Sequence, residues 1–228
     1  MPHRSRRYNE ALKTVDRARS YPLDEAIHIV KGMPPAKFDE TVELAVYLGI
    51  DSRHSDQQVR GTISLPHGTG SSRRVAVFAE GPNADTARAA GADVVGGQEL
   101  IDQVNDGFMD FDVALATPDM MGRIGRLGRV LGPRGLMPSP KSGTVRADIG
   151  PAVKEFKAGM LEFRNDAGGN VHVPVGKRSF TEQQLLENVT ALLDQLTRMK
   201  PPSSKGRYLK KVCITSTMNP GVQVEVTS

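Results

Sequence analysis

The sequence contains no tryptophan, and only 5% of its 228 residues are aromatic. Proteins that bind single-stranded nucleic acid without sequence preference stack successive bases on exposed rings, so an extended stacking platform is hard to build here. Cysteine is nearly absent as well, because Cys213 is the only one, and this excludes an internal disulfide. Cys213 lies in an alternating apolar stretch, where we expect a buried, unreactive thiol in a reducing compartment.

Long apolar runs are also missing. No stretch of about 18 apolar residues marks a membrane helix. The basic start of the chain is followed by further charged residues rather than by the apolar segment of a signal peptide. We therefore expect a soluble, cytoplasmic protein with no membrane partner, whose 38% hydrophobic residues suffice for globular cores.

Acidic residues are unevenly distributed, although the net charge is only +4. Residues 4–19 hold six basic and two acidic residues, and residues 195–224 hold six basic residues and no acid. Basic residues without acids on a common surface are what phosphate neutralisation requires, although such runs are also compatible with plain solvated faces. A third acid-free stretch, 120–147, contains Arg123, Arg126, Arg129, Arg134, Lys141 and Arg146.

The hydrophobic pattern changes twice along the chain. Alternating strands at both ends are typical of antiparallel sheets, whereas the middle alternates short apolar runs with helical stretches, which is typical of βαβ units. We predict a discontinuous α+β domain formed by 1–67 and 160–228, into which an α/β domain, 68–159, is inserted. The outer segments hold 19 basic and 15 acidic residues, but the insert holds 11 of each, so a surface that neutralises nucleic-acid phosphates is expected on the outer domain.

Several local elements follow from periodicity and turn chemistry. We predict a first helix through Leu12, Val15 and Ala18, a strand at 42–50 with a hairpin partner at 59–65, and a second hairpin that turns at 165–170. A Ser179/Glu182 capping box is predicted to begin a long helix. The insert is predicted to contain strands at 74–79, 93–95 and 112–116, helices at 83–90 and 98–104, and then broken helices and loops.

Catalytic patterns do not fit. The glycines of 122–135 lack the spacing of a dinucleotide loop, and Gly176-Lys177 lacks the remainder of a Walker loop. Asp110 and Asp112 precede a strand, whereas ligand sites of α/β sheets lie beyond the carboxyl ends of strands. The histidines show no metal-ligand spacing. We therefore predict no enzyme activity, no cofactor, no metal and no small-molecule substrate.

Four segments together carry a resemblance to a known family: AKFDETVE at 36–43, TPDMMG at 117–122, LGRVLGPRGLMP at 127–138 and TSTMNP at 215–220. They resemble the bacterial type of the large-subunit ribosomal proteins numbered one, the family of the mobile stalk beside the tRNA exit site. The resemblance covers essentially the whole chain. It implies a discontinuous RNA-binding domain with an inserted Rossmann-like domain.

The resemblance also implies function. Its members bind the rRNA of the stalk among other ribosomal components, assist release of deacylated tRNA from the exit site, and repress translation of their own mRNA. Carried over by motif and by position in the hairpin, the expected RNA-binding residues are Lys37, Phe38, Thr41, Arg164, Asn165, Asp166, His172, Ser216, Thr217, Met218, Asn219 and Pro220. A second nucleic-acid surface is expected at Arg123, Arg126, Arg129, Arg134 and Lys141.

Two points stay open at this stage. Periodicity alone favours ordinary core positions for Phe38 and Met218. The family usually has glycine where this chain has Asn219. A tight turn with positive φ would accommodate both residues; if the glycine is instead needed for close approach of the RNA, we expect lower affinity here and no contact by Asn219. The rival functions are a nucleotide-using enzyme, which would show saturable stabilisation by its ligand, and a general RNA chaperone or regulator acting away from the ribosome.

Overall fold

The computed structural model describes residues 4–226. The chain divides into two compact units: one comprises the chain up to Gly70 and from Phe163 onward, and the other comprises Ser71–Glu162. The boundaries predicted from the sequence lie three residues earlier at both junctions. Helices and mixed sheets form the α+β and α/β architecture expected from the sequence.

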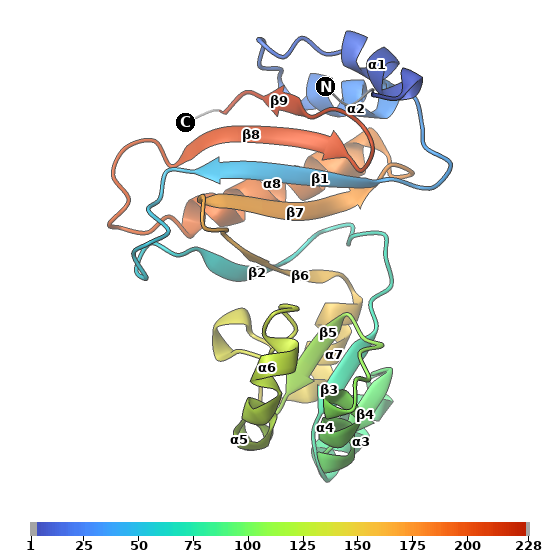
Figure 1. Cartoon of the computed structure of the whole chain (residues 1–228), viewed down its shortest axis with the longest axis vertical. Coiled ribbons are helices and arrows are strands. Elements are labelled where there is room, and N and C mark those ends of the chain that lie inside the picture. Colours follow the sequence, from blue (N-terminus) through green and yellow to red (C-terminus); the bar gives the residue numbers. More distant parts are fainter. Residues whose placement is uncertain (1–3, 227–228) are drawn as a thin grey trace. The chain divides into compact units, whose positions relative to one another are not determined.

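A four-stranded antiparallel sheet forms the centre of the first unit (Figure 1). In spatial order its strands are β7 (Asn170–Lys177), β1 (Thr41–Leu48), β8 (Leu209–Ser216) and β9 (Val222–Val224). The alternation predicted for the first strand is confirmed, because its even-numbered residues from Val42 to Leu48 are buried while Tyr47 is exposed. The apolar side chains of β1 therefore all point to one face of the sheet.

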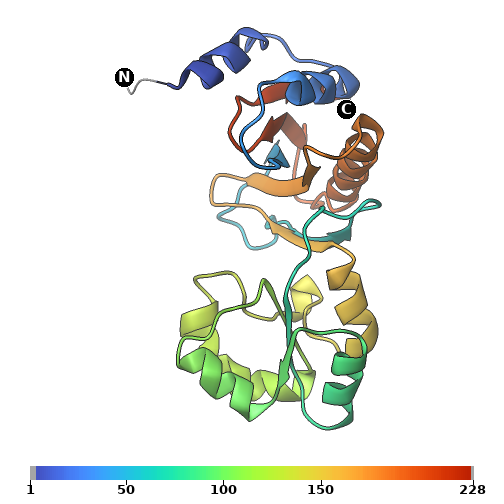
Figure 2. The ribbon, with the colours of Figure 1, turned by 90° about the vertical axis from the view of Figure 1, so that its right-hand side faces the viewer.

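Helices cover that apolar face. α2 (Leu23–Gly32) contacts β8 and β9, and α8 (Glu182–Arg198) contacts β7. Figure 2 shows α8 on one side of the sheet, while α1 (Arg6–Lys13) projects toward the opposite side. Within residues 4–226, no helix covers the second face of the sheet, which carries the half-buried and exposed residues of the strands.

α8 begins two residues later than predicted. Its N-cap is Thr181, and a complete capping box joins Thr181 to Gln184. The predicted N-cap, Ser179, has another partner, because both its hydroxyl and its backbone N–H donate to the Asp39 carboxylate. α1 is shorter than predicted: it ends at Lys13, and the N–H of Ala18 donates instead to the Asp16 carboxylate in a local turn.

Both predicted hairpins are wrong in their pairing. β2 (Arg60–Ser64) does not pair with β1 but forms a separate two-stranded sheet with β6 (Met160–Arg164). A strand has only two edges, and those of β1 are occupied by β7 and β8 over most of its length. The second hairpin turns where predicted, yet β6 and β7 separate beyond the Asn165–Val171 bridge and enter different sheets.

The second unit contains a parallel sheet of order β4-β3-β5, which confirms the predicted βαβ pattern. The strands are β3 (Val75–Phe78), β4 (Val94–Gly96) and β5 (Val113–Ala116), and the longer helices are α3 (Pro82–Ala89), α4 (Gln98–Asn105) and α7 (Ile149–Lys157). α7 was not predicted. Two apolar clusters cover the sheet: one contains residues of α4, and the other residues of α3 and α7.

The acid-free segment forms the predicted broken helices. After η1 (Pro118–Met120), which leads into it, its short elements are α5 (Met121–Ile124), η2 (Gly125–Leu127), α6 (Gly128–Leu131) and η3 (Pro140–Ser142). Four apolar side chains recur at helical spacing and are buried in the cluster with α4: Met120, Ile124, Leu127 and Leu131. The arginines between them are therefore directed outward.

Candidate nucleic-acid interface

The residues predicted to bind RNA fall into two groups at opposite ends of β1. Thr41 begins β1 and pairs with Lys177, while Val42 pairs with Ser216. Tyr47, near the other end, pairs with Asn170. The two ends are about 20 Å apart at the rise of an extended strand. We call one group the Met218 edge (Lys37, Phe38, Thr41 and residues 216–220) and the other the Arg164 hollow (Arg164, Asn165, Asp166 and the residues that line the pocket beside them).

A buried carboxylate organises the Met218 edge. Glu40 has no exposed surface. Its Oε1 accepts hydrogen bonds from the N–H of Ala36 at 2.8 Å and from Arg178 at 3.3 Å. Its Oε2 accepts from the hydroxyl of Ser216 at 2.9 Å and from the N–H of Met218 at 3.1 Å. One side chain therefore ties the segment before β1 to the turn after β8.

The surroundings of Glu40 keep it ionised. Burial raises the pKa of its carboxyl, but hydrogen bonds from Ala36, Met218 and Ser216 and the charge of Arg178 outweigh burial, so the pKa lies below its ordinary value. Arg178 is itself held, because it also donates to the backbone carbonyls of Lys31 and Met33. Glu40 was part of a motif in the sequence, but its burial and its partners depend on strand pairing.

Phe38 and Met218 are exposed at this edge. Their exposed fractions are 54% and 51%, which contradicts the core positions that periodicity favours. Large apolar side chains held in solvent at the same edge are typical of a binding surface rather than of ordinary packing. Lys37 is also exposed.

Three residues of the predicted site face the protein interior. Ser216 and Asn219 are 1% and 8% exposed, and Pro220 is buried. The amide of Asn219 donates to Glu40 and to Ser216 at 3.3 and 2.8 Å. The structure thus corrects the expectation that the Ser216 hydroxyl is open to RNA. No non-glycine residue among 4–226 has a positive φ, so the expected left-handed turn at Asn219 is wrong, and its side chain serves as a hydrogen-bonding group instead.

Backbone bonds join Thr41 to Thr217. The N–H of Thr217 donates to the carbonyl of Thr41, and the N–H of Thr41 donates to the hydroxyl of Thr217, both at 3.0 Å. Lys177 adds a cation that the sequence did not single out, because its ammonium donates to the Thr41 hydroxyl at 2.8 Å. Thr217 remains exposed. Hydrogen bonds therefore hold the backbone of the Met218 edge in place, while the side chains of Lys37, Phe38, Thr217 and Met218 stay exposed.

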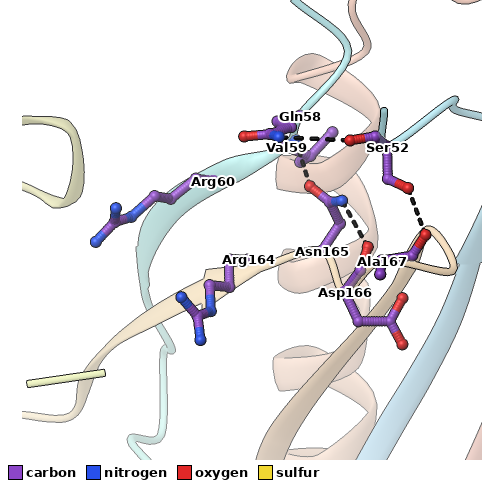
Figure 3. Close-up of a pocket in the computed structure, with 8 residues that line it drawn as sticks. All are labelled: Ser52, Gln58, Val59, Arg60, Arg164, Asn165, Asp166 and Ala167. Atoms are coloured by element: carbon purple, nitrogen blue, oxygen red, sulfur yellow. Dashed lines mark hydrogen bonds between the residues drawn. The ribbon is translucent and has the colours of Figure 1, made fainter. Parts of the chain in front are cut away.

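The Arg164 hollow has a volume of about 600 Å³ (Figure 3). Arg60 and Arg164 both line it, and Figure 3 shows their guanidinium groups projecting to the same side. The amide of Asn165 binds the backbone, accepting from the N–H of Val59 and donating to the carbonyl of Asp166. Arg60 was not predicted, because its pairing with β6 was not.

Asp166 is engaged within its own turn. Its carboxylate accepts hydrogen bonds from the backbone and side chain of Asn170 and from the N–H of Gly168, and these bonds hold its pKa below the ordinary range. We therefore assign the Asp166 side chain to shaping the hollow, whereas Arg164 is exposed and cationic. His172, which is also exposed, lies between the two groups, opposite Ala45 in the middle of β1.

The arginines of the second unit differ in their partners. Arg123 forms an ion pair with Glu80 at 2.6 Å. Arg126, Arg129 and Arg134 are exposed, and we find no ion pair for them within the part of the chain that is described. The side chain of Lys141 lies outside the described residues. The predicted second surface therefore consists, as far as it is described, of exposed arginines on short helical elements and in the turn after α6.

The described residues give little support for metal binding, a membrane-spanning helix or a reactive thiol. Among residues 4–226, no cluster of three or more histidine, cysteine, aspartate or glutamate side chains is arranged to hold a metal ion. None of the helices in that range has the length and apolar character needed to cross a membrane. Cys213 is half-buried rather than fully buried, and burial raises the pKa of its thiol, which keeps the unreactive protonated form dominant.

An antiparallel sheet with a face that no helix of residues 4–226 covers, bordered by exposed apolar side chains and cations, is a surface of the kind found in proteins that bind folded nucleic acid. Comparison with known proteins narrows the class. Residues 29–220 match the Ribosomal protein L1p/L10e family, and the chain belongs to it. It is similar to the large ribosomal subunit protein uL1 of Kosmotoga olearia, with 57% identity over 99% of this chain and 97% of that protein. It is also similar to the protein of the same name from Thermobifida fusca, with 54% identity over 97% of this chain and 94% of that protein.

These relatives are ribosomal proteins, a structural and non-enzymatic family, in agreement with the predicted absence of enzyme activity.

Proposed function

We propose that this protein is a structural component of the large ribosomal subunit and that the Met218 edge and the Arg164 hollow together bind the rRNA of the mobile stalk. Family membership supports a place on the ribosome in the cytoplasm. The observation that carries the proposal is the joint exposure of Phe38 and Met218 on two segments tied to one buried carboxylate. A binding surface that is already ordered loses less conformational entropy when RNA binds.

Each end of the surface has a distinct task. At the Met218 edge, Phe38 and Met218 pack against sugars or bases, while Lys37 and Lys177 neutralise phosphates. At the Arg164 hollow, Arg60 and Arg164 approach the RNA backbone from two paired strands. His172 contacts the RNA between them. RNA that lies along the uncovered face of the sheet reaches both ends, and recognition then depends on RNA shape because the two ends are separated by the length of β1.

Phe38→Ala and Met218→Ala are each expected to weaken binding of an rRNA stalk fragment by about 1–3 kcal/mol, the range for loss of a stacking contact. Affinity is measured by titration at two salt concentrations, and the slope against salt should stay unchanged because no charge is lost. Leu186→Ala is the matched control, since Leu186 is a half-buried apolar residue of α8, the helix on the covered side of the sheet and away from the proposed RNA surface. Wild-type affinity in both variants would contradict the site.

We also propose that the protein represses translation of its own mRNA through the same surface, as the resemblance implies. One surface binds only one RNA at a time, so a leader fragment of the message and the stalk fragment should compete. Phe38→Ala should then weaken both complexes in parallel.

The second unit is proposed to contact exit-site tRNA and to assist its release. The supporting observation is the exposure of Arg126 and Arg129, on short helical elements whose apolar side chains are buried, and of Arg134 in the turn after α6. Such cations attract phosphates without reading bases.

Replacing Arg126, Arg129 and Arg134 together by alanine is expected to lower exit-site tRNA occupancy on ribosomes while changing stalk-fragment affinity by less than about twofold. A control variant with Arg88, Lys154 and Lys157 replaced removes the same charge from α3 and α7, and it should leave occupancy unchanged. Loss of stalk-fragment affinity in the first variant alone would mean that these arginines bind rRNA instead.

A further inference from the structure

The N-terminal helix is latched to the turn that presents Met218. Arg7, in the first turn of α1, donates to the carbonyl of Met218 at 2.8 Å and to the side-chain oxygen of Asn219 at 2.9 Å. The same guanidinium donates to the carbonyl of Pro34 at 3.1 Å. One arginine thus joins α1, the segment before β1 and the turn after β8. A planar guanidinium suits this task because it directs several donors at fixed angles.

The hydrogen bonds of Arg7 hold α1 beside the Met218 edge, and a hollow lies between them. It has a volume of about 230 Å³ and is lined by Arg4, Ser5, Arg7, Tyr8 and Met218. Its walls combine an aromatic ring, a thioether and a cation. The guanidinium of Arg4 lies over the Tyr8 ring at 5.0 Å from the ring centre, so its charge is held at the hollow rather than dispersed in solvent. Ser5 caps α1 by accepting from the N–H of Tyr8.

We propose that this hollow binds an unpaired nucleotide of the stalk RNA, which makes α1 part of the RNA interface. The base packs against Tyr8 and Met218, and Arg4 neutralises the adjoining phosphate. The chemistry matches single-stranded RNA, whose splayed bases are bound by stacking on aromatic and guanidinium planes. Charge supports this occupant as well, because residues 4–19 carry six basic and two acidic residues. The proposal rests on the proposed function, since it needs RNA at the Met218 edge.

The test compares two pairs in which an arginine lies over a tyrosine ring: Arg4 with Tyr8 at the hollow, and Arg19 with Tyr21 away from it. Arg4→Ala and Tyr8→Ala are each expected to weaken binding of the stalk fragment by about fivefold or more. Arg4→Ala should also reduce the salt slope by about one phosphate equivalent. The control is Arg19→Ala, because Arg19 lies over Tyr21 at 4.9 Å in the same terminal segment but does not line the hollow. It should change affinity by less than about twofold.

Two further variants separate binding from folding. Tyr8→Phe keeps the ring, so it should retain wild-type affinity, whereas a purely polar role of Tyr8 predicts a loss. Arg7→Ala should release α1, seen as faster amide hydrogen exchange in residues 6–13, and should weaken RNA binding to about the level of Tyr8→Ala.

The outcomes distinguish this proposal from the proposed function. If Phe38→Ala weakens the complex while Arg4→Ala and Tyr8→Ala behave like Arg19→Ala, α1 is outside the interface and only the present inference is overturned. If neither Phe38→Ala nor Met218→Ala matters, the proposed RNA surface itself is wrong. Weak binding in Tyr8→Ala together with wild-type exchange rates in α1 supports the nucleotide hollow directly.

Discussion

Glu40→Gln is expected to lower the free energy of unfolding by about 3 kcal/mol or more, the cost of removing one partner from a buried ion pair. The amide nitrogen of glutamine is a donor, and it would face donors from Ala36 or from Ser216 and Met218. Arg178 would keep its bonds to backbone carbonyls but lose its counter-ion. Denaturant unfolding at neutral pH measures the change.

The same substitution is expected to weaken stalk-fragment binding, because the segments that present Phe38 and Met218 would no longer share a fixed support. Glu43→Gln is the matched control: Glu43 lies three residues after Glu40, within β1, and is only half-buried. It should change stability by less than about 0.5 kcal/mol. A fully stable Glu40→Gln protein with wild-type affinity would show that the buried carboxylate does not organise the edge.

Acid should act through Glu40 in a defined direction. Its pKa in the folded protein lies below the ordinary value of 4.5, so the unfolded chain takes up this proton first as pH falls. The stabilisation is fully present above that ordinary pKa and is lost as pH falls toward the lower pKa of the folded state. Wild type should therefore lose stability between pH 4.5 and the lower pKa of folded Glu40. Glu40→Gln, which has no carboxyl at this position, should lose less stability over the same pH range.

Phe156→Ala is expected to destabilise the second unit by about 3–5 kcal/mol, the usual range for removing a buried aromatic side chain. Phe156 lies in α7, is 1% exposed, and packs in the cluster that contains Val77 and Leu115. If the stalk-binding surface lies in the first unit, stalk-fragment affinity should stay within about twofold of wild type.

Amide hydrogen exchange resolves which unit responds. Faster exchange should be confined to residues 71–162 in Phe156→Ala. Leu192→Ala, which removes a buried side chain of α8 in the first unit, should show the reverse pattern and weaken RNA binding at temperatures where the first unit begins to unfold. Equal loss of RNA binding in both variants would mean that the two units unfold together or that both contact the fragment.

The differences between sequence and structure have physical causes. Short apolar runs predicted the strands of the second unit well, because a buried parallel strand is apolar along its whole length. Strand partners were predicted wrongly for 59–65, because the edges of β1 go to β7 and β8, which follow more than 120 residues later. The capping box moved from Ser179 to Thr181 because Asp39, distant in the chain, binds Ser179.

The residues of the candidate site also divide into those that the sequence indicated and those that only the structure reveals. Motif resemblance located Phe38, Met218 and Arg164 from the sequence, but it could not separate exposed residues from buried ones. Ser216 and Asn219 belong to the same motif as Met218, yet they point to Glu40. Arg7, Arg60 and Lys177 gave no local signal, because their roles depend on residues that the fold brings beside them.

The sequence by itself determined the composition of the protein, the hydrophobic periodicity of each strand and helix, the change in hydrophobic pattern along the chain and the family to which the protein belongs. These properties depend on residues that are neighbours in the chain. Only the tertiary structure decided which strands pair, that Glu40 is buried, and that Phe38 and Met218 remain in solvent. The reason is physical: burial, hydrogen bonding and charge neutralisation depend on distances between atoms, and at this site those atoms belong to residues as far apart in the sequence as Arg7 and Asn219.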